Sequence, residues 1–283
     1  MKLKNKIIFM TGATSGFGKV AACHMASQGA LVVATSRNQE KGHELLASYL
    51  KNYPDGKGQI DLIKCDLDSF ESIVSACHEV QKKYDRLDMI INNAGVMNFN
   101  FRASANDIEQ TFQINLLAPV LIIHLLSGML EQSPEPKIIN TASALHQGII
   151  HFEDLESRKK FTGFDAYRQS KLGIILISRY LAEKNINIYS QHPGLVKTEL
   201  GRDFNRLAKA IFRLMGKSPK KGARTLLNLV ETPVKDLTSG EYYADCKIKK
   251  ITEESYDLAV AEKLLETTRS YLSPYLTEPS FIF

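Results

Sequence analysis

Residues 7–18 read IIFMTGATSGFG, and they join a short apolar strand to a glycine-rich loop that opens a helix. The glycines Gly12, Gly16 and Gly18 allow a tight turn and a close approach of the backbone to a pyrophosphate. The free N–H groups at the start of the helix, with their partial positive charge, favour an anion there. An ordinary strand-to-helix turn is the alternative, but a strand before and a helix after the loop favour dinucleotide binding.

Short β-rich runs alternate with longer segments of helical spacing along the chain. The predicted strands are Ile7–Met10, Ala30–Ala34, Gln59–Lys64, Met89–Ile91, Lys137–Asn140 and Ile186–Gln191, and the predicted helices are Gly16–Gln28, Gln39–Leu50, Ser69–Tyr84, Ile108–Leu130 and Phe164–Glu183. This alternation predicts an α/β fold, a Rossmann-type doubly wound parallel sheet with helices on both faces. Ligands in such folds bind beyond the carboxyl ends of the strands.

The composition is that of one globular domain. Of 283 residues, 44% are hydrophobic and 24% are charged, which excludes a disordered chain, a collagen and a coiled-coil rod. The net charge of +5 is only mildly basic and does not indicate a nucleic-acid partner. We therefore expect a single domain over residues 1–283.

The four cysteines indicate a reduced, cytoplasmic protein. They are scattered and form no Cys-x-x-Cys pair, so neither a zinc site nor a redox motif is expected, and the lone histidines are not expected to bind a metal. The apolar run Ile7–Met10 is too short for a signal peptide. No run of about 20 apolar residues is apparent, so we expect no transmembrane span.

The end of the second predicted strand decides which dinucleotide fits. NAD sites usually place an Asp or Glu there, which binds the ribose 2′-OH. This chain has Ser36 followed by Arg37, and no carboxylate to repel a 2′-phosphate. Arg37 can pair with that phosphate, and Thr35 or Ser36 can donate hydrogen bonds to it. NADP(H) is therefore favoured over NAD(H), the alternative being a solvated Arg at a helix start.

A tyrosine and a lysine four residues apart share one face of a predicted helix, in the segment Tyr167-Arg168-Gln169-Ser170-Lys171. A nearby ammonium lowers the pKa of a phenol from its usual ~10, so Tyr167 can act as general acid–base on a carbonyl oxygen. Ser143, just after the fifth strand, is placed to hydrogen-bond the same oxygen. A Tyr–Lys pair alone is more often an ordinary surface pair, but the dinucleotide loop upstream makes the combination specific.

These features together resemble the short-chain dehydrogenase/reductase (SDR) family. The matching motifs appear in the family's order over about residues 5–200 and are Thr11–Gly18, Asp66-Leu67, Asn92-Asn93-Ala94-Gly95, Asn115, Ser143, Tyr167-x-x-x-Lys171, and Pro193-Gly194 with Thr198. The resemblance implies that Asn115, Ser143, Tyr167 and Lys171 are catalytic, with Asn115 holding a water that links Lys171 to solvent. Without it, Asn92-Asn93 is equally a strand-end turn and Pro193-Gly194 a chain break.

The resemblance also assigns the cofactor site. Asp66, with Leu67, contacts the adenine, Asn93, Ala94 and Gly95 line the adenosine ribose, and Pro193, Gly194, Val196 and Thr198 hold the nicotinamide. The full set of implied cofactor-binding residues is Gly12, Thr14, Ser15, Gly16, Phe17, Gly18, Ser36, Arg37, Asp66, Leu67, Asn93, Ala94, Gly95, Tyr167, Lys171, Pro193, Gly194, Val196 and Thr198.

A narrower resemblance is to the retinol-dehydrogenase-like branch. Ser143 and Tyr167 are 24 residues apart, longer than the family's commonest spacing, with His151-Phe152-Glu153-Asp154-Leu155 in the insertion. Two further segments, Lys221–Arg224 and Gly240–Cys246, are also similar to that branch. Residues 1–200 then form the cofactor and catalytic core, 201–235 a substrate lid, and 236–283 a C-terminal strand and helix.

The variable segment 202–224 is basic and amphipathic, with eight basic residues against one acid and an apolar stripe at helical spacing. A lid helix with a solvated basic face is the favoured interpretation, and a weak contact with an anionic membrane surface is the alternative. Either one indicates a bulky, lipophilic substrate, whose pocket His146, Phe152, Phe161 and Phe164 are expected to join.

We therefore expect an NADP(H)-dependent oxidoreductase that transfers a hydride between nicotinamide and a carbonyl or carbinol carbon, with reduction of a lipophilic aldehyde or ketone as the favoured direction. One alternative is a retinol- or steroid-type alcohol dehydrogenase that works oxidatively. Another is a non-catalytic dinucleotide-sensing protein. The resemblance further implies a homodimer, paired through the helix with Tyr167 and the long helix before Ser143.

Overall fold

The structure is a computed structural model, and it describes residues 2–196 and 216–276. Its described residues form one eight-stranded sheet of order β3-β2-β1-β4-β5-β6-β7-β8, in which only β8 is antiparallel to its neighbour. The strands are β1 (Ile7–Met10), β2 (Leu31–Ser36), β3 (Gln59–Lys64), β4 (Met89–Asn92), β5 (Lys137–Thr141), β6 (Ile188–His192), β7 (Tyr242–Ala244) and β8 (Lys247–Ile248).

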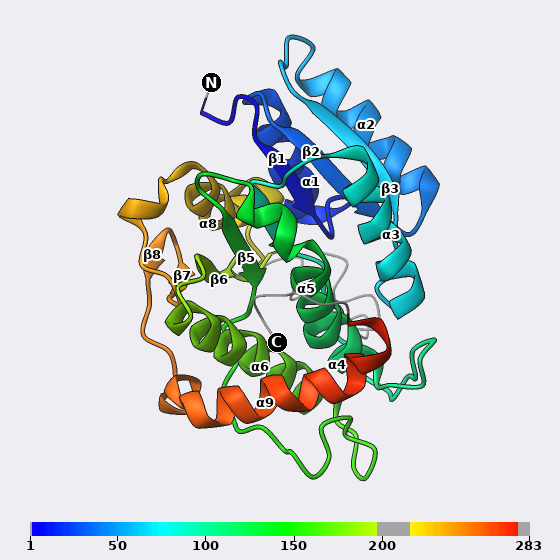
Figure 1. Ribbon diagram of the computed structural model, residues 1–283, viewed down its shortest axis with the longest axis vertical. Helices are drawn as coiled ribbons and strands as arrows, with labels where there is room; N and C mark the ends of the chain where they lie inside the picture. Colours follow the sequence, from blue (N-terminus) through cyan, green and yellow to red (C-terminus); the bar gives the residue numbers. More distant parts are fainter. Residues whose placement is uncertain (1, 197–215, 277–283) are drawn as a thin grey trace.

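Helices cover both faces of this sheet (Figure 1). One face packs against α1 (Gly16–Ser27), α2 (Gln39–Asn52) and α8 (Pro219–Glu231), and the other against α3 (Phe70–Lys83), α5 (Ala118–Glu131) and α6 (Gly163–Glu183). The last long helix, α9 (Leu258–Leu272), lies along α6. Short turns complete the described elements: α4 (Gln110–Phe112), a π-helical turn (Gln113–Leu117), and 3-10 turns at Val234–Asp236, Glu253–Tyr256 and Ser273–Tyr275. The predicted doubly wound α/β fold is confirmed.

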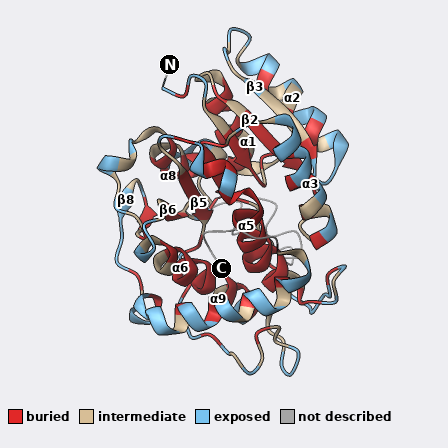
Figure 2. Cartoon of the chain, viewed as in Figure 1, coloured by how far each residue is buried: buried red, intermediate tan, exposed pale blue. Residues whose placement is uncertain are grey.

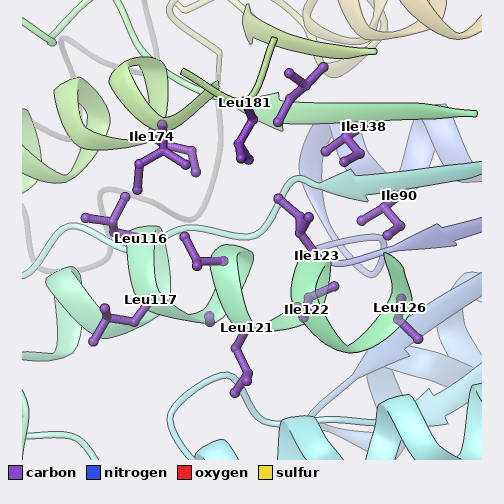
Figure 3. Close-up of a cluster of buried hydrophobic side chains, with 14 of the residues drawn as sticks. Ile90, Leu116, Leu117, Leu121, Ile122, Ile123, Leu126, Ile138, Ile174 and Leu181 are labelled. Carbon is purple, nitrogen blue, oxygen red and sulfur yellow. The ribbon is translucent and has the colours of Figure 1, made fainter. Parts of the chain in front are cut away.

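The alternation of side chains along the strands builds the two cores. In β1, Ile8 and Met10 face α1 and α8, while Phe9 faces α3 and α5, as the two-residue period of a strand requires. Figure 2 shows burial concentrated on the strands and on α5. In Figure 3, Ile90 of β4 and Ile138 of β5 meet side chains from α5 and α6.

Helix starts follow from local capping chemistry. The side chains of Asn38, Ser69, Thr162, Ser218 and Asp257 each accept a backbone N–H from the first turn of the helix that follows. Among the described long helices, α1 and α5 lack such a bond: α5 continues directly from the π-helical turn, whereas α1 begins after a loop, and its N-cap Ser15 makes no side-chain capping bond. The N–H groups of α1 therefore face the carboxyl edge of the sheet without a side-chain partner.

The predicted helix Ile108–Leu130 is divided into α4, the π-helical turn and α5. Pro119 has no N–H, so it cannot donate the usual α-helical bond to the carbonyl of Asn115, four residues earlier. The neighbouring Ala118 N–H donates to Gln113, five residues back, which is the π-helical spacing. The π turn thus falls on one of the expected catalytic residues.

One stretch, Gln110–Glu131, is long and apolar enough to cross a membrane by length and composition. This corrects the expectation that no such run exists. In the structure its most apolar part is 94% buried inside the protein, where it forms the centre of one core.

Candidate active site

Three elements bring the four expected catalytic residues together. Ser143 follows β5, Tyr167 and Lys171 lie on α6, and Asn115 lies in the π turn, and all four side chains are buried. The Ser143 side chain lies close enough to the Tyr167 hydroxyl to influence its pKa. Because Leu145 N donates to Ser143 Oγ at 3.1 Å, Ser143 keeps its own hydroxyl proton for another acceptor.

The pKa of Tyr167 is raised above its ordinary value, chiefly because the phenol is buried, while the hydrogen bond with Ser143 lowers it in part. The sequence-based prediction that Lys171 lowers this pKa is therefore not what the structure shows. Lys171 Nζ lies 5.7 Å from the centre of the Tyr167 ring and donates to the carbonyl of Thr141 at 2.8 Å. Burial also lowers the pKa of Lys171 to about 8. For both Tyr167 and Lys171, burial has a larger effect on the pKa than the charge of the other group.

Asn115 is held rigidly. Its Oδ1 accepts from Val96 N at 2.9 Å, and its Nδ2 donates to Val96 O at 2.9 Å and to Ser170 Oγ at 3.0 Å. Both amide protons are thus used within the protein.

Gly95 keeps a space open between two of these groups. A Cβ on Gly95 would lie 3.2 Å from Asn115 Oδ1 and 3.4 Å from Lys171 Nζ. Any side chain at this position would intrude between Asn115 and Lys171, which explains on steric grounds why the site has a glycine here.

The glycine-rich loop is built for close backbone approach. Gly12 has φ +67°, and a Cβ there would lie 2.7 Å from Ala94 N. A Cβ on Gly18 would lie 2.1 Å from the Gly12 carbonyl oxygen. Thr11 Oγ1 accepts from Asn93 N and Ala94 N, at 3.0 and 3.1 Å, which joins the loops after β1 and β4.

These observations fit a dinucleotide phosphate. The loop containing Thr14 and Ser15 leads into the uncapped N-terminus of α1, whose N–H groups suit a pyrophosphate. The side chain of Phe17 is buried in the core beneath α1 and α8, so only its backbone is available to a ligand.

At the expected adenosine end of the cofactor site, Arg37 and Asp66 lie close together, and the Ser36 hydroxyl is bonded within the turn that follows β2. Arg37 is exposed, and its guanidinium lies 3.9 Å from Asp66 Oδ1. Ser36 Oγ donates to the carbonyl of Asn38 at 2.6 Å. Leu67 packs on the core and uses its carbonyl to accept from Gln113, at the start of the π turn. Arg37 is thus an exposed cation next to the end of β2.

At the nicotinamide end, the segment after β6 turns at Gly194, with φ +82°, and is bridged from Val196 to Lys217. Lys217 is also paired with Asp245 at 2.8 Å. Pro193 precedes this turn, while Thr198 lies outside the described residues.

Several residues with a part in the site were not assigned from the sequence. Thr141 accepts from Lys171 through its carbonyl, and its hydroxyl lies between Gln191 Nε2 and Asn93 Oδ1. Ser170 bonds Asn115. The positions of Thr141 at the end of β5 and of Ser170 between Tyr167 and Lys171 were the available signals.

The residues expected to form the lid and the substrate pocket lie in different surroundings in the structure. Within 201–235, residues 201–215 lie outside the described residues, and α8 packs against α1, with Gly222 closely covered by Val196. Among the expected pocket residues, His146 bonds the Ser143 carbonyl, Phe161 meets Phe101 edge-on, and Phe164 is exposed. Phe152 differs, because it packs on the core under Lys263 of α9.

Sequence comparisons place these features in context. The family model described as short chain dehydrogenase matches residues 6–208. Mouse retinol dehydrogenase 14 is 33% identical over 281 residues, covering 93% of this chain and 84% of the relative. Human retinol dehydrogenase 11 is 33% identical over 275 residues, covering 95% and 86%. The chloroplastic short-chain dehydrogenase TIC 32 A of Brassica napus is 33% identical over 282 residues, covering 92% and 87%.

Solved structures share the fold at lower identity. A crystal structure of a protein from Mycobacterium paratuberculosis has a TM-score of 0.76 at 22% identity and covers 98% of this chain and 96% of its own. A metagenomic short-chain oxidoreductase in complex with NADP has a TM-score of 0.63 at 20% identity, with 86% and 97% covered.

Proposed function

We propose that this chain, which belongs to the short-chain dehydrogenase family and to its retinol-dehydrogenase-like branch, reduces the carbonyl group of a lipophilic substrate with NADPH. The observation that supports the chemistry best is the buried, neighbouring pair of Ser143 and Tyr167, with Lys171 on the same helix as Tyr167. A pure dinucleotide sensor has no need of this pair.

The protonation of Tyr167 favours reduction. With its pKa above the ordinary value, Tyr167 keeps its proton at neutral pH and can donate it to a carbonyl oxygen. Ser143, whose Oγ accepts from Leu145 N, can turn its hydroxyl proton to the same oxygen, so two donors orient it and stabilise the charge that develops there. The Lys171 ammonium, behind Tyr167, adds positive charge that stabilises the phenolate left after transfer.

When bound, NADPH supplies the hydride that reaches the carbonyl carbon. The residues that would hold it are the loop Gly12–Gly18, Arg37 at the 2′-phosphate, and the segment Pro193–Val196. Arg37 is exposed, and its side-chain neighbour Asp66 is weakly engaged at 3.9 Å, so the guanidinium is free to turn to a phosphate. The end of β2 carries Ser36, followed directly by Arg37, and no acidic residue stands at either position.

The lipophilic substrate class is supported by apolar side chains after the strands that end at the site. Phe99, Phe101, Ile149, Phe164 and Leu195 are exposed large hydrophobic residues that follow β4, β5 and β6 or begin α6. The relatives named as retinol dehydrogenases act, by that name, on an apolar alcohol. For the location we propose the cytoplasm, since Cys23, Cys65, Cys77 and Cys246 are all unpaired thiols.

The test is a fluorescence titration with NADPH and NADH, which the absence of Trp makes simple. We expect clearly tighter NADPH binding in the unchanged protein. Arg37→Ala should weaken NADPH by about 10- to 100-fold, because a charge-assisted contact is lost, and leave NADH nearly unchanged. Lys82→Ala, at an exposed position of α3, is the matched control. Equal affinity for NADH would refute the NADP preference, and no binding of either would refute the enzyme itself.

A carbonyl panel then tests the reaction. Aromatic and long-chain aldehydes and ketones are offered with NADPH to the unchanged protein and to Tyr167→Phe. We expect turnover that Tyr167→Phe abolishes while NADPH binding is retained. Oxidation of alcohols without any carbonyl reduction would favour the oxidative alternative, and turnover that survives in Tyr167→Phe would remove Tyr167 as the acid.

A further inference from the structure

We infer that His146 and His192 grip the peptide group between Ser143 and Ala144 from its two ends, and that this histidine clamp positions the Ser143 hydroxyl toward Tyr167. The inference rests on the proposed function for its consequence in turnover. The two histidines come from different elements, since His146 lies in the loop after β5 and His192 ends β6.

The two hydrogen bonds act on a single rigid unit. His146 Nδ1 lies 2.9 Å from the carbonyl oxygen of Ser143, and the N–H of Ala144 donates to His192 Nδ1 at 3.2 Å. The carbonyl of Ser143 and the N–H of Ala144 belong to the same planar peptide group. Hydrogen bonds at both ends of the peptide group set the orientation of its plane. They therefore also set the direction of the Cα–Cβ bond of Ser143.

The chemistry requires opposite tautomers. A carbonyl oxygen only accepts, so His146 must have its proton on Nδ1, whereas an amide N–H only donates, so His192 must have a bare Nδ1 and its proton on Nε2. Both rings are neutral near pH 7. Burial lowers the pKa of His146, and burial with nearby Lys217 and His146 lowers that of His192 to about 4, against an opposing effect of Asp245.

The surroundings fix the rings themselves. His146 is 5% exposed, and its ring packs against Tyr242 of β7, with ring centres 5.3 Å apart. His192 is a strand residue, paired in register with Ala244 of β7. The loop that presents Ser143 is therefore tied to the two strands beyond β5, and Ser143 Oγ can point to Tyr167 without searching other orientations.

Substitution of each histidine by Asn and by Phe separates the effect of the hydrogen bond from the effect of the ring. The Asn side-chain amide can place a donor or an acceptor near the position of Nδ1, while Phe keeps a ring without either. We expect His146→Phe and His192→Phe to lower kcat by about 5- to 10-fold, the worth of one hydrogen bond, with NADPH affinity unchanged. His146→Asn and His192→Asn should stay within about twofold of the unchanged protein. His78→Asn, at an exposed position of α3, is the matched control.

A double-mutant cycle shows whether the clamp acts through Ser143. In a Ser143→Ala background, His146→Phe should lower kcat no further, because the group that it positions is already gone. A loss of the same fold in both backgrounds would show a merely structural role and overturn the inference. Thermal melts are recorded for every variant, and His146→Gln, whose amide lies beyond the Nδ1 position, is a second loss variant in case Phe impairs folding.

An NMR experiment decides the geometry without turnover. Nitrogen-15 spectra of the imidazole rings in the unchanged protein should show His146 protonated at Nδ1 and His192 at Nε2. The same tautomer at both rings, or a charged His192 at neutral pH, would overturn the clamp. If no carbonyl is reduced at all, the proposed function and the role in turnover both fail, while the tautomers still report on the clamp.

Discussion

Replacing Lys171 with Met should make the protein more stable and inactive. Lys171 is buried, and its ammonium donates to a single described acceptor, the carbonyl of Thr141. Burial lowers its pKa from 10.5 to about 8. At 1.36 kcal/mol per pKa unit, the folded protein spends about 3 kcal/mol to keep this charge in place. Met removes that cost but leaves the Thr141 carbonyl without its donor, which costs about 1–2 kcal/mol.

The net expectation is a gain of about 1–2 kcal/mol in the free energy of unfolding at pH 7 for Lys171→Met, with carbonyl reduction lost. The sign with pH follows from the lowered pKa. Between pH 8 and 10.5 the unfolded chain binds the proton that the folded chain has released, so the stability of the unchanged protein rises with pH over this window. The advantage of Lys171→Met is therefore full below pH 8, is gone about one pH unit higher, and is reversed near pH 10.5.

Urea unfolding of both proteins at pH 7 and pH 10, followed by circular dichroism, measures this difference. Lys137→Met is the control, because Lys137 is also buried with a pKa lowered to about 8. Its ammonium donates to three carbonyls, those of Leu229, Val230 and Thr232. Three orphaned acceptors outweigh one relieved charge, so Lys137→Met should lose about 1–3 kcal/mol. A Lys171→Met protein that is less stable than the unchanged one at pH 7, or equally advantaged at pH 10, would refute the reasoning.

Three further outcomes are expected. Gly18→Ala should weaken NADPH binding more than about tenfold in a fluorescence titration, because its Cβ meets the Gly12 carbonyl, whereas Gly128→Ala, with no atom within 4 Å, should add about 0.5–1 kcal/mol to the free energy of unfolding. Glu109→Ala should lower that free energy by about 2–3 kcal/mol in urea, since the buried carboxylate accepts two backbone N–H groups at the start of α4. Between pH 7 and 9, kcat/KM for reduction should fall about tenfold as Lys171 deprotonates, and a flat profile would contradict the role given to its charge.

The sheet and most of its helices could be predicted from the sequence because their signals are local. Alternating strands and amphipathic helices determine the doubly wound fold, and the predicted limits of β1 and β3 agree with the structure to the residue. The last part of the chain was harder. The apolar stripe of α8 shows that one face is buried, but not that α1 is its partner, because a stripe of this kind suits a lid or a core equally.

The site shows the same division between local and long-range information. The pair Tyr167 and Lys171 follows from helical spacing, but the direction of the Tyr167 pKa follows from burial, which the spacing does not contain. The π turn at Asn115 has a local signal in Pro119, four residues on, that was readable in advance. The histidine clamp joins residues 48 positions apart in the chain at one of its ends, so only the fold reveals it.

The two buried lysines indicate how structure separates a working charge from a structural one. Lys137 begins β5 and Thr141, the acceptor of Lys171, ends it, so both ammonium groups are anchored to opposite ends of one strand. Both have a pKa lowered to about 8 by burial, which for Lys137 outweighs an opposing effect of Glu135. The two lysines differ in their number of acceptors. Lys137 donates to three carbonyls at the end of α8, which use all three of its ammonium protons. Lys171 donates to one carbonyl and has protons left to donate toward Tyr167 and the space beside Gly95. An incompletely satisfied buried cation at the carboxyl edge of a parallel sheet is what acid–base chemistry requires, and it is also why we expect Lys171→Met to stabilise the fold while it ends the reaction.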